Sequence, residues 1–413
     1  MNTAQISVCA LKCLLRIFIG VWVPVVSAFT QEITARYSPD SGSTSPEKFT
    51  NTTPVKGFCS ISGGFYCDSN TYSVRVPIDF NSTGALVANH PSERQGAMFK
   101  VPAQWREVTV HHRESGSQEK VKIKISGIGA TYVTPDVRTL TGLNDFSVAH
   151  RALWGYGWGI APQPCLNSRY YKDTATTYEF FWKTPVDAVC ARTTRYDIPF
   201  FRYRDLSISY ELMTPNPLGM SQGTYTGSLN YRIGPSGDFD MGDVMQPSDE
   251  NLTFNFSLNV EHMLKVELPP GGERVELVPE GGWQAWLQNP ARIPKKLFRD
   301  QTFHISASGP FSMRLICSNI YGEWCAIRNE NNHSIPVAVY VSLPSGIVNS
   351  QGRPVDRQAL RNDLDVKFQP GIYVDYKPAT LHFEADRWVD EMLRDHAGST
   401  YLGTITVVWD SEV

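Results

Sequence analysis

Short runs of alternating residues recur along the sequence and constrain its fold more than any other feature. β-Branched and aromatic residues occupy every second position of these runs, which are separated by clusters of Gly, Pro, Asn and Asp. This pattern is typical of antiparallel β-sandwiches. The runs are Tyr72–Ile78, Val108–His112, Val121–Ile125, Thr177–Trp182, Leu206–Leu212, Thr224–Ile233, Leu252–Val260, Phe303–Ile305, Ser312–Cys317, Val337–Val341 and Thr404–Trp409. The sequence therefore predicts an all-β protein.

Helical periodicity is confined to two short segments. The first has apolar residues spaced along one helical face and is closed by Gly398, so we expect a short helix there. That face consists of Ala385, Trp388, Val389 and Met392. A weaker candidate for a helix runs from Asp356 to Leu364.

The N-terminal residues have the pattern of an export signal. Lys12 and Arg16 precede an apolar run at positions 17–26, which ends in small residues, so we expect residues 1–28 to be removed and Phe29 to become the N-terminus. The apolar run is too short to span a bilayer as an anchor, and charges interrupt the later apolar stretches. The pattern predicts a mature chain outside the cytoplasm.

Six of the eight cysteines remain after removal of Cys9 and Cys13 with the signal. In an oxidising compartment an even set indicates disulfides. Two close pairs each flank a Gly-containing turn of hairpin length, and the remaining two cysteines are then left to each other. The expected pairs are Cys59 with Cys67, Cys317 with Cys325, and Cys165 with Cys190. No CxxC motif or Cys/His spacing favours a metal site.

Charge and motifs argue against several function classes. The formal net charge is −3, without a charged tail or long block, so nucleic acid is not an expected partner. The sequence has no GxSxG elbow, HExxH, P-loop or GxGxxG after a strand. Asp238, Asp240 and Asp243 lack the order of a calcium-binding EF-hand, and we expect them to be solvated loop acids. The sequence thus predicts no enzyme, cofactor or metal.

A change of composition indicates a domain boundary. The strand that ends at Ile233 is followed by Gly, Pro and Ser, then by acidic residues up to Glu250, and alternation resumes at Leu252. We therefore expect two domains, at residues 29–251 and 252–413.

The C-terminal run resembles the last strand of chaperone–usher pilins. It reads GSTYLGTITVVW from Gly398 to Trp409, with Tyr and Gly ahead of alternating Thr and aliphatic residues. The close and wide cysteine pairs precede two further segments, Asn216–Arg232 (NPLGMSQGTYTGSLNYR) and Phe254–Leu268 (FNFSLNVEHMLKVEL). In this order the mature chain resembles the tip adhesins of the colonization-factor (class 5) fimbriae and their minor-subunit relatives.

The resemblance implies two Ig-like β-sandwich domains: an N-terminal adhesin domain and a C-terminal pilin domain that lacks its last strand. An open edge of that kind invites aggregation unless another chain supplies the strand. In such fimbriae a periplasmic chaperone, and later a pilin subunit, inserts it by donor-strand complementation. The implied partners are that chaperone, an outer-membrane usher, a major pilin that donates a strand, and a host-cell glycan or glycoprotein. The implied location is the fimbrial tip at the cell surface.

Two terminal segments bear on this assembly. The residues of the last strand expected to contact chaperone or subunit are Tyr401, Ile405, Val407 and Trp409. The alternative for this strand is a place inside a closed sandwich. Phe29–Tyr37 also alternates and would suit a donor strand, but we expect it to be the first strand of the adhesin domain itself.

Two clusters and two single residues are candidates for receptor binding. Glycines separate the aromatic residues of the first cluster and leave the backbone free to expose the rings, which with an adjacent cation suit sugar stacking. This cluster comprises Arg151, Trp154, Tyr156 and Trp158. In the second, Arg202 and Arg204 alternate and would share one face. The resemblance adds Lys56 and Arg232. The competing interpretation of the aromatic residues is sandwich core.

Two other functions stay open at this point. A non-adhesive minor pilin that only initiates fimbrial assembly would have the same domains without a receptor site. A secreted carbohydrate-active enzyme would instead need two carboxylates on either side of a glycosidic bond.

Overall fold

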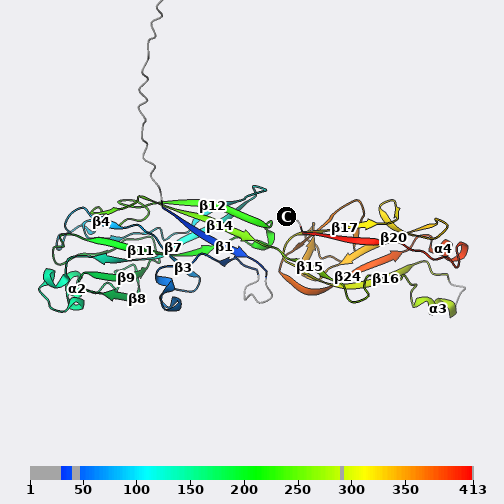
Figure 1. Cartoon of the computed structure of the whole chain (residues 1–413), viewed down its shortest axis with the longest axis horizontal. Coiled ribbons are helices and arrows are strands. Elements are labelled where there is room, and N and C mark those ends of the chain that lie inside the picture. Colours follow the sequence, from blue (N-terminus) through cyan, green and yellow to red (C-terminus); the bar gives the residue numbers. More distant parts are fainter. Residues whose placement is uncertain (1–28, 40–46, 289–292, 412–413) are drawn as a thin grey trace, which may run out of the picture.

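The chain folds into two lobes that follow one another along its long axis (Figure 1). The computed structural model describes residues 29–39, 47–288 and 293–411, so the expected signal peptide lies outside the described residues. Strands β1 to β14 build the first lobe and strands β15 to β25 the second. The chain is all-β with two groups of sheets, as the alternating runs predicted. Among the described residues, no helix has the length and apolar character needed to cross a membrane.

The first lobe contains most of the strands and two short α-helices. Its elements are β1 (Phe29–Tyr37), β2 (Thr50–Asn51), η1 (Phe58–Gly64), β3 (Thr71–Arg75), β4 (Phe80–Ser82), η2 (Glu93–Gln95), β5 (Ala97–Phe99), β6 (Arg106–His112), β7 (Gln118–Val133), α1 (Val137–Thr141), α2 (Phe146–Trp154), β8 (Leu166–Asp173), β9 (Thr177–Lys183), β10 (Cys190–Arg192), β11 (Arg202–Met213), η3 (Pro217–Gly219), β12 (Gly223–Arg232), β13 (Met245–Pro247) and β14 (Asn251–Val260).

A 12-stranded sheet forms the frame of this lobe. Its order is β13-β4-β11-β7-β6-β12-β14-β1-β2, and β3, β8 and β9 pair off this path. The first strand, β1, runs parallel to β14, with Phe29 opposite Leu252 and Tyr37 opposite Val260. Thus Phe29–Tyr37 is the first strand of this lobe, as expected. Because β14 belongs to the same sheet, the change to the second set of sheets falls between Val260 and Leu264.

The second lobe has the elements β15 (Leu264–Glu267), α3 (Gly282–Gln288), β16 (Leu297–Ala307), β17 (Phe311–Cys317), β18 (Ile320–Tyr321), β19 (Trp324–Arg328), β20 (Ser334–Ser342), β21 (Ile347–Asn349), β22 (Gln358–Leu360), β23 (Val366–Pro370), β24 (Val374–Ala385), α4 (Val389–Asp395) and β25 (Ile405–Ser411). A 7-stranded sheet runs β15-β16-β24-β20-β19-β18, with β22 beside β20, and a 4-stranded sheet runs β21-β23-β17-β25. Phe303 and Val339 of the first sheet share one core with Phe311 and Phe368 of the second, which makes this lobe a sandwich.

The helices of the structure agree only in part with those predicted from apolar periodicity. The helix expected around Val389 is present as α4. The helix proposed for Asp356–Leu364 is wrong, because β22 occupies that segment and pairs with Val339–Val341 of β20. Helix α2 was not foreseen, although its caps are visible in the sequence. The Asp145 side chain accepts from the Val148 N–H, and Gly155 closes the helix at a φ of 79°.

All three expected disulfides are present. Cys59 pairs with Cys67, Cys165 with Cys190, and Cys317 with Cys325. Their Cα atoms are 5.5, 5.9 and 5.4 Å apart, respectively, within the ordinary range for a disulfide. The positions of the cysteines in the sequence were therefore sufficient to predict every disulfide pair.

The three loop aspartates are not simply solvated. The Arg94 guanidinium binds Asp240 at 2.9 Å and Asp243 at 2.7 Å, and Arg106 pairs with Asp238. Asp240 is only 2% exposed. Burial alone would raise the pKa of Asp240, but hydrogen bonds from Arg94 and from two backbone N–H groups outweigh burial and lower that pKa. These aspartates thus hold the loop after β12 against the rest of the lobe.

Asp240→Asn should destabilise the first lobe by about 2 kcal/mol, because it removes charge-assisted hydrogen bonds to Arg94. Since the carboxylate has a lowered pKa when folded, its contribution is present above the ordinary aspartate pKa and disappears as the pH falls through the folded pKa. The stability gap between wild type and variant should therefore narrow in acid. Thermal melts from neutral pH to pH about 3 measure this gap.

The matched control is Asp205→Asn. Asp205 forms exposed ion pairs, at 3.6 Å to Arg75 and 3.6 Å to Arg204, and such pairs contribute little. Its φ of 56° also suits asparagine. Equal losses in the two variants would contradict a structural role for Asp240.

Candidate functional site

Strand β25 lies at an open edge of the second lobe. It pairs antiparallel with β17 from Ile405 to Ser411 and is the end strand of its sheet. In the facing sheet, β15 is likewise an end strand. Along the outer edge of β25, the described residues supply no further ladder. Such an edge is a template for another strand.

A groove of about 330 Å³ opens beside this edge, between the two sheets. We call it the C-terminal groove. Its lining includes Val266 of β15, Phe303 of β16, Leu381 of β24, and Val407 and Trp409 of β25. The Trp409 ring meets the Phe303 ring at 5.1 Å. The wall of the groove is thus the edge of the lobe's own apolar core.

The core-facing side of β25 is incompletely covered. Ile405, Val407 and Trp409 are only half-buried and pack against the core cluster, whereas Val337 and Val339 of the central strand β20 are buried. Side chains at alternate positions of a strand share one face, so these three point to the same side. The sandwich is therefore open at β25.

Tyr401, the fourth residue expected to contact a chaperone or subunit, lies apart from the groove, with its hydroxyl 2.7 Å from Nδ1 of His333.

The aromatic receptor candidates occupy two different environments. Trp154 and Trp158 are 3% and 0% exposed, so the expectation that the glycines expose their rings is wrong for both. Trp158 packs against Phe180 and Trp182 in the core of the first lobe. Tyr156, between them, is 64% exposed. The two tryptophans are therefore part of the sandwich core, which was the alternative to a receptor-binding role.

A buried hydrogen-bond chain fixes helix α2 on strand β7. Nε2 of His150 lies 2.7 Å from the Thr174 carbonyl oxygen, and Nδ1 lies 2.6 Å from Oη of Tyr132. Burial lowers the pKa of His150 and favours the neutral ring. Nε2–H then donates to the carbonyl, Nδ1 accepts from the Tyr132 hydroxyl, and Trp154 Nε1 donates to Tyr132 Oη at 3.2 Å. This chain positions Arg151, the next residue, at the surface.

Beside α2 lies a cavity of about 300 Å³, which we call the distal pocket. It lies in the region of α2, β8 and β9, at the end of the first lobe remote from the second (Figure 1). Its lining is Ser147, Arg151, Gly157, Gly159, Ile160, Asn167, Arg169, Tyr171, Asp173 and Tyr178. The 57% exposed Tyr171 stacks on Tyr178 with ring centroids 5.7 Å apart. A Cβ at Gly159 would lie 2.9 Å from the Tyr171 ring, so the close approach of this ring to the backbone depends on glycine there.

The distal pocket is rich in cationic groups. Arg151 and Arg169 are exposed, and among the described residues neither forms an ion pair. The Asp173 carboxylate accepts from Ser147 Oγ at 2.6 Å. Beneath the pocket, Arg192 is 8% exposed and donates to the carbonyl oxygens of Gly157 and Ile160.

No carboxylate pairs with Arg192 within the described part of the chain, and its Nε is buried without a partner. Burial lowers the pKa of Arg192. A buried cation without a counter-ion is costly. Arg192 is thus a buried cation that binds the backbone of two residues bordering the distal pocket, Gly157 and Ile160, without lining the pocket itself.

The other basic candidates lie elsewhere. Arg202 and Arg204 are exposed on β11, as their alternation indicated, and pair with Asp79 and Asp205. Lys56 is exposed before η1, and Arg232 is exposed at the end of β12. None of these four lines the distal pocket, whereas Arg151 does. Arg169 and Tyr171 were not predicted from the sequence, and alternation could not have found them, because β8 is irregular between Asn167 and Tyr171 and Arg169 has a φ of 68°.

Comparisons with known proteins give matches to solved structures alone. No family model matches the sequence, and no curated protein matches it. A chain from the chaperone–tip adhesin complex of CFA/I fimbriae shares 9% identity over 92% of this chain and 96% of its own, with a TM-score of 0.27. A mutant of the CFA/I adhesin CfaE of enterotoxigenic E. coli shares 10% over 93% and 92%, with a TM-score of 0.26.

A third match comes from the CsuC–CsuE chaperone–tip adhesion subunit complex of the archaic Csu pili of Acinetobacter baumannii. It shares 8% identity over 92% of this chain and 97% of its own, with a TM-score of 0.21. All three solved structures contain a fimbrial adhesin or a pilus tip subunit, and each shares no more than 10% identity with this chain.

Proposed function

We propose that this chain is a fimbrial tip adhesin with one functional site in each lobe. The N-terminal lobe is the adhesin domain, and the C-terminal lobe is a pilin domain that lacks its last strand. The domains meet in the linker between Val260 and Leu264. The observation that carries the proposal is the half-buried apolar face of Ile405, Val407 and Trp409 beside an unpaired strand edge.

The C-terminal groove accepts a strand from another chain. Addition of a strand to a free edge supplies main-chain hydrogen bonds, and alternate apolar side chains of that strand fill the groove. In this proposal a periplasmic chaperone first occupies the groove at the outer-membrane usher, and a major pilin subunit later replaces it. The adhesin then stands at the fimbrial tip outside the cell.

The distal pocket binds the receptor, a host-cell glycan or glycoprotein that carries an anionic group. Arg151 and Arg169 supply charge-assisted hydrogen bonds to that group. Tyr171 offers an exposed aromatic face on which a sugar ring packs. The position of the pocket, remote from the groove, leaves it accessible when the second lobe is bound to a fibre (Figure 1).

The same pocket argues against the enzymatic alternative. A glycosidase of the usual kind needs two carboxyl groups around its substrate, whereas Asp173 is the single carboxylate among the described residues that line the distal pocket. We therefore propose binding without catalysis.

Arg151→Ala and Arg169→Ala should each weaken binding to anionic glycans by roughly 10-fold or more, because each removes a charge-assisted contact. A glycan array and a cell-adhesion assay measure this loss, and melting temperatures should not change. Arg204→Ala, an exposed arginine outside the distal pocket, is the control. If only Arg204→Ala loses binding, the receptor site lies on β11 and not in the distal pocket. A wild type that binds no glycan or cell would favour the assembly initiator.

A further inference from the structure

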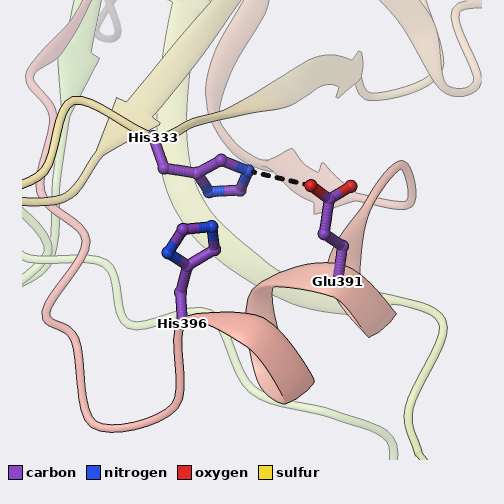
Figure 2. Close-up of side chains that lie close together, drawn as sticks. All are labelled: His333, Glu391 and His396. Carbon is purple, nitrogen blue, oxygen red and sulfur yellow. Dashed lines mark ion pairs between the residues drawn. The ribbon is translucent and has the colours of Figure 1, made fainter.

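Three side chains with metal-binding atoms converge in the second lobe, away from both sites described above. Figure 2 shows the His396 ring stacked on the His333 ring and the Glu391 carboxylate directed at the His333 ring. His333 directly precedes β20, Glu391 lies in α4, and His396 is the residue that caps the end of α4. The sequence analysis found no metal motif because these residues are brought together by the packing of α4 on the β19–β20 turn.

The geometry of this cluster is close to that of a metal centre. Nε2 of His333 is 3.7 Å from Oε1 of Glu391, and the His333 and His396 rings stack with centroids 4.0 Å apart. One ligand atom from each residue lies within 4.8 Å of the others. Ligands of a tetrahedral zinc ion, at about 2.0–2.2 Å from the metal, are roughly 3.4 Å from one another. Because the two imidazole rings are stacked at an interplanar angle of 21°, at least one of them must also rotate before both can bind the same ion.

A second layer of hydrogen bonds already orients His333. Its Nδ1 lies 2.7 Å from Oη of Tyr401, and Asn329 Nδ2 donates to the same oxygen at 3.4 Å. The His333 backbone N–H donates to Asn329 Oδ1 at 2.8 Å. Metal-binding histidines commonly have one ring nitrogen held in this way, which leaves the other for the metal. Here the nitrogen left free is Nε2, the one that faces Glu391.

The chemical types of the three ligand groups indicate which metal ion they would bind. Two imidazoles and one carboxylate match the ligands of zinc sites with an open fourth position, whereas calcium and magnesium prefer oxygen ligands alone. The Glu391 and His333 side chains are 46% and 21% exposed, so an ion can enter from solvent. Water can take the fourth position on the exposed side.

We propose that His333, Glu391 and His396 bind one divalent transition-metal ion of the zinc type. The ion ties α4 to the β19–β20 turn next to Tyr401. Backbone bonds between Arg328 and Leu402 continue from there towards β25. Metal binding thus stiffens the segment that leads into the edge strand of the C-terminal groove. The inference does not depend on the receptor or on the proposed function.

Zinc titration of the full mature chain, fused to a donor strand and purified without a polyhistidine tag, tests the site. Calorimetry should find one Zn²⁺ per chain, and Co²⁺ should give the visible absorption of a tetrahedral site. His396→Ala and Glu391→Gln should each weaken Zn²⁺ binding by at least about 10-fold, and Tyr401→Phe, which removes the hydroxyl that orients His333 and accepts from Asn329, by roughly 10-fold. Zn²⁺ should raise the melting temperature of wild type but not of His396→Ala.

The control variant is His304→Ala, which removes a histidine stacked on Tyr376 in the same lobe. It should bind Zn²⁺ as wild type does. Because Glu391 is an exposed helix residue, Glu391→Gln preserves the fold even where a histidine variant does not. Equal affinities for wild type, His396→Ala and Glu391→Gln, or no binding by wild type, would overturn the proposal. Loss of binding in His304→Ala alone would also overturn it.

Discussion

Fusion of a donor strand after Val413 through a flexible linker should raise the melting temperature of the second lobe by about 10 °C and should convert a chain that is expected to aggregate into a monomer. The reason is the half-buried face of Ile405, Val407 and Trp409, which continues into Val266 and Phe303 across the groove. A strand that places about four apolar side chains there gains roughly 8 kcal/mol of burial. Ordering the strand offsets most of this gain.

A net stabilisation of about 3 kcal/mol remains, and each kcal/mol shifts the melting temperature of a domain of this size by about 2–4 °C. Differential scanning calorimetry and size-exclusion chromatography measure the two effects. The matched control is the same linker and peptide with its apolar positions changed to Asn, which keeps the backbone hydrogen bonds and removes the burial. Val407→Asp in β25 should also abolish the gain.

A chain without the extension that is already monomeric and as stable as the fusion would show that the groove needs no further strand. The proposed role of the C-terminal lobe in fimbrial assembly would then fail, whereas the distal pocket would be unaffected.

Trp158→Ala should destabilise the first lobe by about 3–5 kcal/mol, the usual cost of truncating a large buried aromatic residue. Trp158 is 0% exposed, and its ring packs against seven other aromatic rings. The nearest four belong to Phe180 at 4.7 Å, Tyr132 at 4.9 Å, Trp154 at 5.0 Å and Trp182 at 5.1 Å. At about 2–4 °C per kcal/mol, the melting temperature should fall by roughly 6–20 °C.

Trp158→Phe should be much milder than its change in volume suggests. The Nε1 of Trp158 is buried without a hydrogen-bond partner, so phenylalanine removes an unsatisfied donor together with part of the ring. The hydrogen bond from Trp182 Nε1 to the Trp158 carbonyl, at 2.7 Å, uses the backbone and survives both substitutions. Comparison of the stability lost in Trp158→Ala with that lost in Trp158→Phe thus separates the effect of packing from the effect of the unpaired N–H.

Tyr156→Ala is the control, because Tyr156 is 64% exposed in the same loop and its removal should leave the melting temperature unchanged. A wild-type melting temperature in Trp158→Ala would contradict the central place of this ring. The series also separates fold from binding. If the proposed receptor site is right, Trp158→Ala should lose both stability and receptor binding, whereas Arg151→Ala should lose binding alone.

Local order in this protein could be predicted to a large extent from the sequence. The strands follow from alternation, as in Val108–His112 and Leu252–Val260, because the side chains of a strand alternate between two faces whatever it pairs with. The disulfides follow from cysteines close in sequence around turns, and α4 follows from a short helical stripe. These features depend on neighbouring residues, so the sequence by itself determined them.

The sites required the tertiary structure. Whether Trp158 is exposed or buried depends on the packing of the loop after α2 over β9, and Arg151 meets Arg169 and Tyr171 because β8 pairs with β9 beside that helix. The His333 cluster and the open edge of β25 arise from contacts between elements far apart in the chain. Periodicity predicts which residues share a face. Only the packing of the sheets decides what covers that face.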